Sequence, residues 1–149
     1  MIFRSNEPYE SSRIHAAAVY CSDGRLGNHF DDFIQQCLGL PRYDRVALPG
    51  GPASLLTYPQ VRLERQGILE ELAFLAEAHG LTRIVLIAHS GCAFYRARLG
   101  LTEPGMEFVQ RTDIGRAVAL VHATTGVQQI EAYFARSEPD AVTFERIPV

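Results

Sequence analysis

The sequence predicts an α/β fold with three layers, in which a mostly parallel sheet of four to five strands carries helices on both faces. Short apolar runs alternate with longer amphipathic stretches along the chain, which is the pattern of βαβ units. The run at 83–88 (RIVLIA) is almost wholly apolar, as expected of a central parallel strand covered on both faces. The chain has 149 residues, so a single domain over residues 1–149 is expected.

The first half of the chain supplies two expected strands and two expected helices. Residues 15–20 (HAAAVY) form a strand, and residues 26–37 form a helix that places Cys37 on its apolar face. Residues 43–48 form a second strand, which a Pro-Gly-Gly-Pro loop at 49–52 closes. Residues 61–79 form the longest helix, with an apolar stripe that runs from Leu63 to Ala76 and a stop at Gly80.

The second half continues the alternation after the strand at 83–88. A linker that contains Gly100, Pro104 and Gly105 precedes a helix over about residues 107–123. A second helical stretch is expected over about residues 127–135, after Gly126. Residues 142–147 form the last strand.

Composition excludes several classes of protein. The net charge is −3, which argues against a nucleic-acid partner, and all 14 basic residues are arginine, which argues against Lys-dependent chemistry. No apolar stretch approaches the roughly 20 residues of a membrane span, so no membrane partner is expected. The N-terminal residues lack the apolar core of a secretory signal, and three cysteines without such a signal indicate reduced thiols. We therefore expect a cytoplasmic protein.

Two short motifs follow expected strands and point to a metal. Cys21 comes directly after the first strand, while His89 and Cys92 come directly after the strand at 83–88. Two thiolates and one imidazole form a good zinc set that leaves a fourth position open. Because the first and third strands are natural neighbours in such a sheet, these residues are predicted to bind one Zn²⁺ per chain.

Asp23 and Arg25 stand beside the first of these motifs. Their spacing allows a carboxylate–guanidinium pair, which keeps the carboxylate charged and able to accept a hydrogen bond from metal-bound water. An ordinary structural interpretation is also open, in which each cysteine is a small core residue and Asp23–Arg25 is a loop salt bridge. His15, His29, His79 and His122 have no ligand partner at a sensible spacing.

Cys-x-Asp-x-Arg after the first strand, with His-x-x-Cys after the third, resembles the β-class carbonic anhydrases. The resemblance extends from about residue 14 to 98. It implies zinc on Cys21, His89 and Cys92, with Asp23 and Arg25 as the catalytic dyad. It also implies a lyase in which zinc hydroxide attacks CO2 to give bicarbonate, and a homodimer with active sites near the subunit interface.

One loop departs from that family, and several alternatives stay open. The family's Arg-Asn-Ala-Gly loop is replaced here by Ala-Leu-Pro-Gly-Gly at 47–51. A hydrolase of carbonyl sulfide or carbon disulfide, or a non-catalytic zinc-binding homologue, would fit such a change. A serine hydrolase is a further alternative, because Ser90 lies in an elbow-like sequence and Asp113 and His122 follow in triad order.

Overall fold

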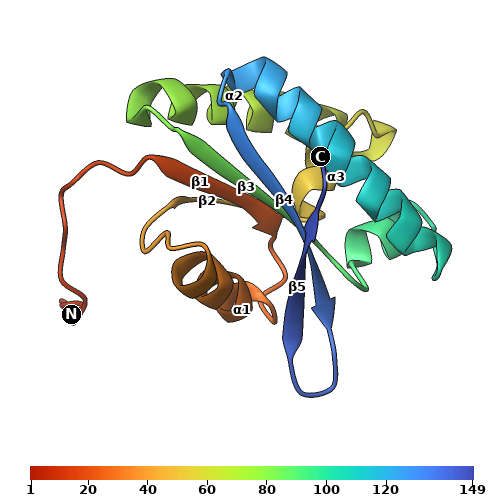
Figure 1. Ribbon diagram of the computed structural model, residues 1–149, viewed down its shortest axis with the longest axis horizontal. Coiled ribbons are helices and arrows are strands. Elements are labelled where there is room, and N and C mark those ends of the chain that lie inside the picture. The colour runs from red at the N-terminus through yellow and green to blue at the C-terminus, as the bar shows by residue number, and fades with distance from the viewer.

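A five-stranded sheet forms the middle layer of the computed structural model, which describes residues 1–149 (Figure 1). The spatial order of its strands is β2 (Asp44–Leu48), β1 (Ala16–Cys21), β3 (Arg83–His89), β4 (Gln129–Ser137) and β5 (Val142–Ile147). The first four are mutually parallel, and β5 runs antiparallel to β4. The prediction of a mostly parallel α/β sheet is confirmed.

Helices cover both faces of this sheet (Figure 1). The two long helices, α2 (Arg62–His79) and α3 (Gly105–Thr125), lie on one face, and α1 (Gly27–Asp32) lies on the other. Short helical turns occur at Phe33–Cys37, Gly51–Leu55, Pro59–Val61 and Phe94–Arg98. None of the helices is both long and apolar enough to span a bilayer.

The two central strands β1 and β3 are buried on both faces, and their side chains alternate between two cores. Val19 of β1 and Leu86 of β3 belong to the core under α2 and α3. Their neighbours Tyr20 and Ile87 belong to the core on the α1 side. Because the side-chain period of a strand is two, a nearly continuous apolar run supplies both cores at once.

Cys37 is not a core residue, contrary to the prediction; its side chain is exposed. The helix that starts at Gly27 continues as a π-helical turn over Phe33–Cys37, in which the Leu38 amide donates to the Phe33 carbonyl. The wider i→i+5 turn changes the angular spacing of the side chains and rotates Cys37 off the buried face. Leu63, placed on the apolar stripe of the long helix, is also exposed, at 83%.

The stretch at 127–135 was predicted to be helical, and this is wrong. The preceding helix α3 ends at Gly126, whose φ of 71° is left-handed, and β4 begins at Gln129. Ala132 and Phe134 of β4 face one core while Tyr133 and Ala135 face the other. Burial on both faces of the sheet removes the polar alternation that would have distinguished this strand from a helix.

The first 15 residues form an arm with no helix or strand, which extends away from the start of β1 (Figure 1). Arg42 holds its base, because the guanidinium donates to the backbone carbonyls of Glu10 at 3.0 Å and Ser12 at 3.2 Å. The beginning of the arm exposes Ile2 and Phe3 at 98% and 87%.

Candidate metal centre

Cys21, His89 and Cys92 meet at the carboxyl edge of the sheet. Cys21 is the last residue of β1 and His89 is the last residue of β3, and these strands are hydrogen-bonded neighbours. The chain turns at Gly91, with a φ of 66°, and so returns Cys92 to the same point. The adjacency of the two strands, which the sequence predicts, therefore brings residues from distant parts of the chain together.

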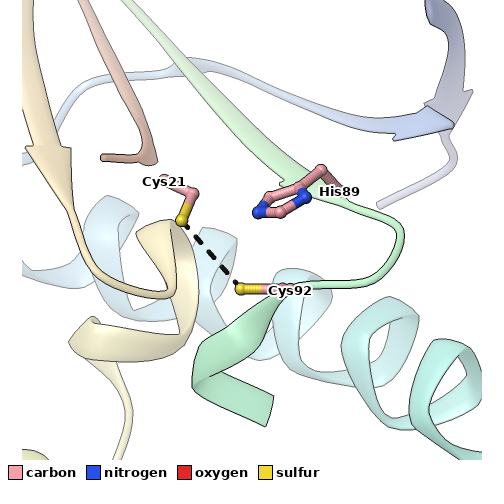
Figure 2. A group of neighbouring side chains, drawn as sticks. All are labelled: Cys21, His89 and Cys92. Carbon is pink, nitrogen blue, oxygen red and sulfur yellow. Dashed lines mark hydrogen bonds between the residues drawn. The ribbon is translucent and has the colours of Figure 1, made fainter. Parts of the chain in front are cut away.

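The three side chains converge on one position (Figure 2). The two Sγ atoms are 4.0 Å apart, and the two sulfurs and the nearest histidine nitrogen all lie within 4.8 Å of one another. Two thiolates on one tetrahedral zinc would be separated by about 3.8 Å, given Zn–S bonds of about 2.3 Å. The pair of sulfurs therefore has almost the spacing that a tetrahedral ion requires.

The His89 ring is oriented as a metal ligand would be. Its Nδ1 lies 2.9 Å from the Ser90 carbonyl oxygen, which fixes Nδ1 as the hydrogen-bond donor. Its Nε2 is buried and has no hydrogen-bond partner. In Figure 2 one ring nitrogen faces the two sulfur atoms. A buried nitrogen without a hydrogen-bond partner lowers the stability of the fold unless it binds a further group. Two thiols and this nitrogen together form a donor set that fits a zinc ion.

The two sulfur atoms have different environments. Their mutual hydrogen bond is the largest effect, and it lowers the pKa of the Cys21 thiol to about 4; burial opposes this, while His89 and the Gly50 amide assist it. The same bond, together with burial, raises the pKa of the Cys92 thiol. The contact between the two sulfurs therefore favours deprotonation of one of them, and a thiolate is the form that binds a soft cation.

The loop after β2 packs against Cys21 through its backbone. A Cβ atom added to Gly51, whose φ is 53°, would lie 2.8 Å from the Cys21 backbone nitrogen. A Cβ added to Gly50, whose φ is 87°, would lie 2.6 Å from Cγ of the Phe94 ring. Both positions therefore require glycine, for space as well as for backbone conformation.

Asp23 and Arg25 form the ion pair that their spacing predicts. The Arg25 Nη2 lies 2.6 Å from Asp23 Oδ2, its Nε lies 3.0 Å from Oδ1, and its backbone amide also donates to Oδ1. These hydrogen bonds from Arg25 lower the pKa of Asp23 to about 2. The carboxylate is thus ionised and turned to the guanidinium. It does not belong to the cluster of potential metal ligands.

Helix α3 holds the loop that carries two of the three candidate ligands, a contact that sequence reasoning missed. The fully buried Gln110 donates from Nε2 to the His89 carbonyl oxygen at 2.8 Å. One turn further, Asp113 accepts hydrogen bonds from the Tyr58 hydroxyl at 2.5 Å and the Tyr95 hydroxyl at 3.0 Å. Polar residues in the middle of an amphipathic helix were the only signal in the sequence, and they do not indicate a partner.

The serine-hydrolase alternative has no triad in this structure. Asp113 is buried and bonded to the two tyrosines, while His122 contacts Gln128. Both residues belong to α3, where nine steps of about 1.5 Å separate them by about 13.5 Å along the axis, too far for a hydrogen bond. The Ser90 hydroxyl accepts the Ser137 amide at 3.0 Å instead of contacting a histidine.

The sequence as a whole matches one family model, described as "Putative carbonic anhydrase", over residues 11–144. The chain belongs to this family. None of the curated proteins matches it in sequence. Membership in the carbonic anhydrase family accounts for the order of the Cys-x-Asp-x-Arg and His-x-x-Cys motifs, and it extends the resemblance into the last third of the chain.

Solved carbonic anhydrases share the fold. The β-carbonic anhydrase isoform I of Trichomonas vaginalis superposes with a TM-score of 0.56 at 16% identity, covering 95% of this chain and 87% of the other. The carbonic anhydrase of Streptococcus mutans gives a TM-score of 0.50 at 16% identity, covering 91% of this chain and 82% of the other. The chain is thus a divergent member with the fold of the β-class enzymes.

Proposed function

We propose that this protein is a zinc-dependent lyase that interconverts CO2 and bicarbonate. The observation that carries the proposal is the buried Cys21–His89–Cys92 cluster, whose sulfurs are 4.0 Å apart and whose His89 Nε2 has no partner within the protein. These three side chains would hold one Zn²⁺. When bound, zinc supplies Lewis acidity, which brings the pKa of a coordinated water toward neutrality.

The protein's own residues supply orientation and proton handling. Asp23 stays ionised across the neutral range because Arg25 holds its pKa near 2. An ionised carboxylate beside the centre would accept a hydrogen bond from a reacting hydroxyl group and so orient it toward the substrate carbon. Arg25 pairs with that carboxylate and so would keep it from becoming a further ligand of a bound ion. Gln110 and Gly51 fix the backbone that carries the ligands.

The direct test is the metal content and activity of the purified protein. We expect about one zinc per chain and CO2 hydration by stopped flow between pH 6 and 9 in the metal-replete protein. Cys92→Ser replaces a thiolate with a neutral hydroxyl and should lose most of the zinc; Cys37→Ser, at an exposed cysteine away from the cluster, is the matched control and should retain it. Full occupancy in Cys92→Ser would contradict the assignment of the ligands.

The same measurements separate the other candidate functions. Stoichiometric zinc without CO2 hydration would favour a binding protein, and turnover of carbonyl sulfide or carbon disulfide in its place would favour a hydrolase. We also propose that the protein acts as a homodimer in the cytoplasm, where reducing conditions keep the ligand cysteines from forming disulfides.

A further inference from the structure

A cleft of about 400 Å³ opens beside the metal centre. It is lined by the candidate ligand His89, by Arg25 and His29, and by Arg96 from the turn after Cys92. Gly91 and Arg96 also line a second cleft of about 350 Å³. Arg96 therefore lines both clefts, the first of which it shares with the candidate ligand His89.

Arg96 has no salt-bridge partner, although Glu103 lines the second of the two clefts. The Arg96 Nη2 donates to the Gly91 carbonyl oxygen at 2.8 Å, whereas the charge of Arg25 is balanced by Asp23. The residues that line the first cleft include no Asp or Glu. A cleft with excess positive charge and no carboxylate of its own attracts anions.

The remaining donors suit an anion with two coplanar oxygens. A guanidinium has five N–H groups in one plane. Arg96 donates one of them to the Gly91 carbonyl oxygen, and the remaining N–H groups leave one edge of the guanidinium free to bond both oxygens of an anion. The Ser90 hydroxyl accepts the Ser137 amide and so keeps its own proton free to donate. A neutral or cationic ligand of the same size would leave these donors without a charged partner.

We propose that Arg96 is a specificity-determining residue of an oxyanion subsite in this cleft, which takes a planar oxyanion of the bicarbonate or carboxylate class. The choice of bicarbonate as the natural ligand rests on the proposed function. The charge of the cleft and the free edge of the guanidinium are independent of the proposed function.

The test compares two neighbouring arginines of the same helical turn. Arg96→Gln removes the cleft charge, whereas Arg98→Gln is the matched control, because Arg98 lies over the Phe94 ring and near Glu64, outside the cleft. The dissociation constant of bicarbonate for the zinc-loaded protein is measured by isothermal titration calorimetry. We expect Arg96→Gln to raise it by about tenfold, the effect of losing one charged hydrogen bond, and Arg98→Gln to leave it unchanged.

Acetate and acetamide provide a second readout that does not depend on turnover. They have nearly the same shape but differ in charge, so the wild type should bind acetate more tightly and Arg96→Gln should lose most of that preference. Wild-type bicarbonate affinity and an unchanged acetate preference in Arg96→Gln would overturn the subsite.

Zinc content and CO2 hydration, measured on the same samples, report separately on the proposed function. If the wild type shows no hydration while bicarbonate binding still depends on Arg96, the proposed function fails and the subsite stands. If the wild type is active and Arg96→Gln binds bicarbonate normally, the subsite fails and the proposed function stands.

Discussion

At the scale of residues, the proposed function assigns a role to the Asp23–Arg25 pair beside the candidate centre. Asp23 is 18% exposed and Arg25 is 82% exposed, so the guanidinium is free to leave while the carboxylate stays near the cluster. Three hydrogen bonds from the guanidinium and one from the Arg25 amide hold the carboxylate in its present orientation. We propose that the pair acts as a gate on the fourth coordination position of a bound ion.

Arg25→Ala tests this gate. Without the guanidinium, Asp23 is free to turn to bound zinc and occupy the fourth position, so zinc content should stay high while the hydration rate falls by orders of magnitude. Asp23→Asn should also slow hydration, because a neutral amide accepts a hydrogen bond less strongly than a carboxylate, but it should leave the fourth position open to added anions. Zinc content, anion binding and rate are measured on the same preparations. A wild-type rate and anion affinity in Arg25→Ala would show that the pair is only structural.

At the scale of elements, α3 holds in place, by hydrogen bonds, the loop between β3 and the turn at Phe94–Arg98. Gln110 and Asp113 lie three residues apart on the same side of α3 and hold the two ends of that loop, at the His89 carbonyl and the Tyr95 hydroxyl. Burial raises the pKa of Tyr58 and of Tyr95, as does the contact with Asp113, so both hydroxyls remain protonated donors at neutral pH.

Gln110→Ala removes the donor to the His89 carbonyl and leaves a buried acceptor unpaired. We expect a loss of about 1–3 kcal/mol in the free energy of unfolding, measured by denaturant titration, together with weaker zinc binding in a chelator competition. Gln66→Ala, at a solvent-facing glutamine of α2, is the control and should change neither quantity. Normal zinc affinity in Gln110→Ala would show that α3 does not position His89.

The pairing of β3 and β4 carries a buried ion pair at the other end of the sheet. The Arg83 Nη2 lies 2.9 Å from Glu131 Oε2, and Gln129 and Tyr133 donate to the same carboxylate. Burial alone would raise the pKa of Glu131, but these three donors outweigh it and lower the pKa to about 2. The ionised side chain is therefore stabilised by the fold.

This pair predicts how stability depends on pH. Because the pKa of Glu131 is lower in the folded state, its contribution is complete above the unfolded value of about 4.5 and is lost as the pH falls through about 2. Glu131→Gln should cost about 3 kcal/mol at pH 7 and much less near pH 2, measured by denaturant unfolding across that range. Glu71→Gln, at an exposed position on α2, should show no such dependence. Equal losses at both ends of the range would assign the effect to packing instead.

At the scale of the whole molecule, two features of the surface are suited to a second copy of the chain. β2 is an edge strand whose outer hydrogen-bonding groups have no strand partner, and the N-terminal arm exposes Ile2, Phe3 and Tyr9. Unpaired edges and exposed apolar side chains favour association.

We expect a dimer at micromolar concentration in sedimentation experiments. Deletion of residues 1–8, which leaves the Arg42 contacts with Glu10 and Ser12 in place, should weaken it by removing apolar surface. A monomer at that concentration would remove the dimer proposal and leave the metal proposal unaffected.

The sequence by itself determined the class of fold and which three residues meet at the candidate centre. Apolar runs such as the one at 83–88 specify buried strands through hydrophobic patterning, which is a local property. Strands that alternate with helices lead to parallel neighbours, and residues just after such strands lie at one edge. The sequence alone therefore places Cys21, His89 and Cys92 together.

Only the tertiary structure decided those features that depend on contacts between residues far apart in the sequence. The strand Gln129–Ser137 is specified by burial between β3 and β5, since its own pattern does not distinguish it from a helix. Cys37 is exposed because a π-helical turn changes the angular spacing of side chains, and the prediction of a buried Cys37 assumed the spacing of an α-helix. The contacts of Gln110 and of Arg96 join residues whose positions relative to each other are set by packing. Local periodicity fixes which face a side chain takes within its own element, but which atoms it then meets is decided by how the elements pack against one another.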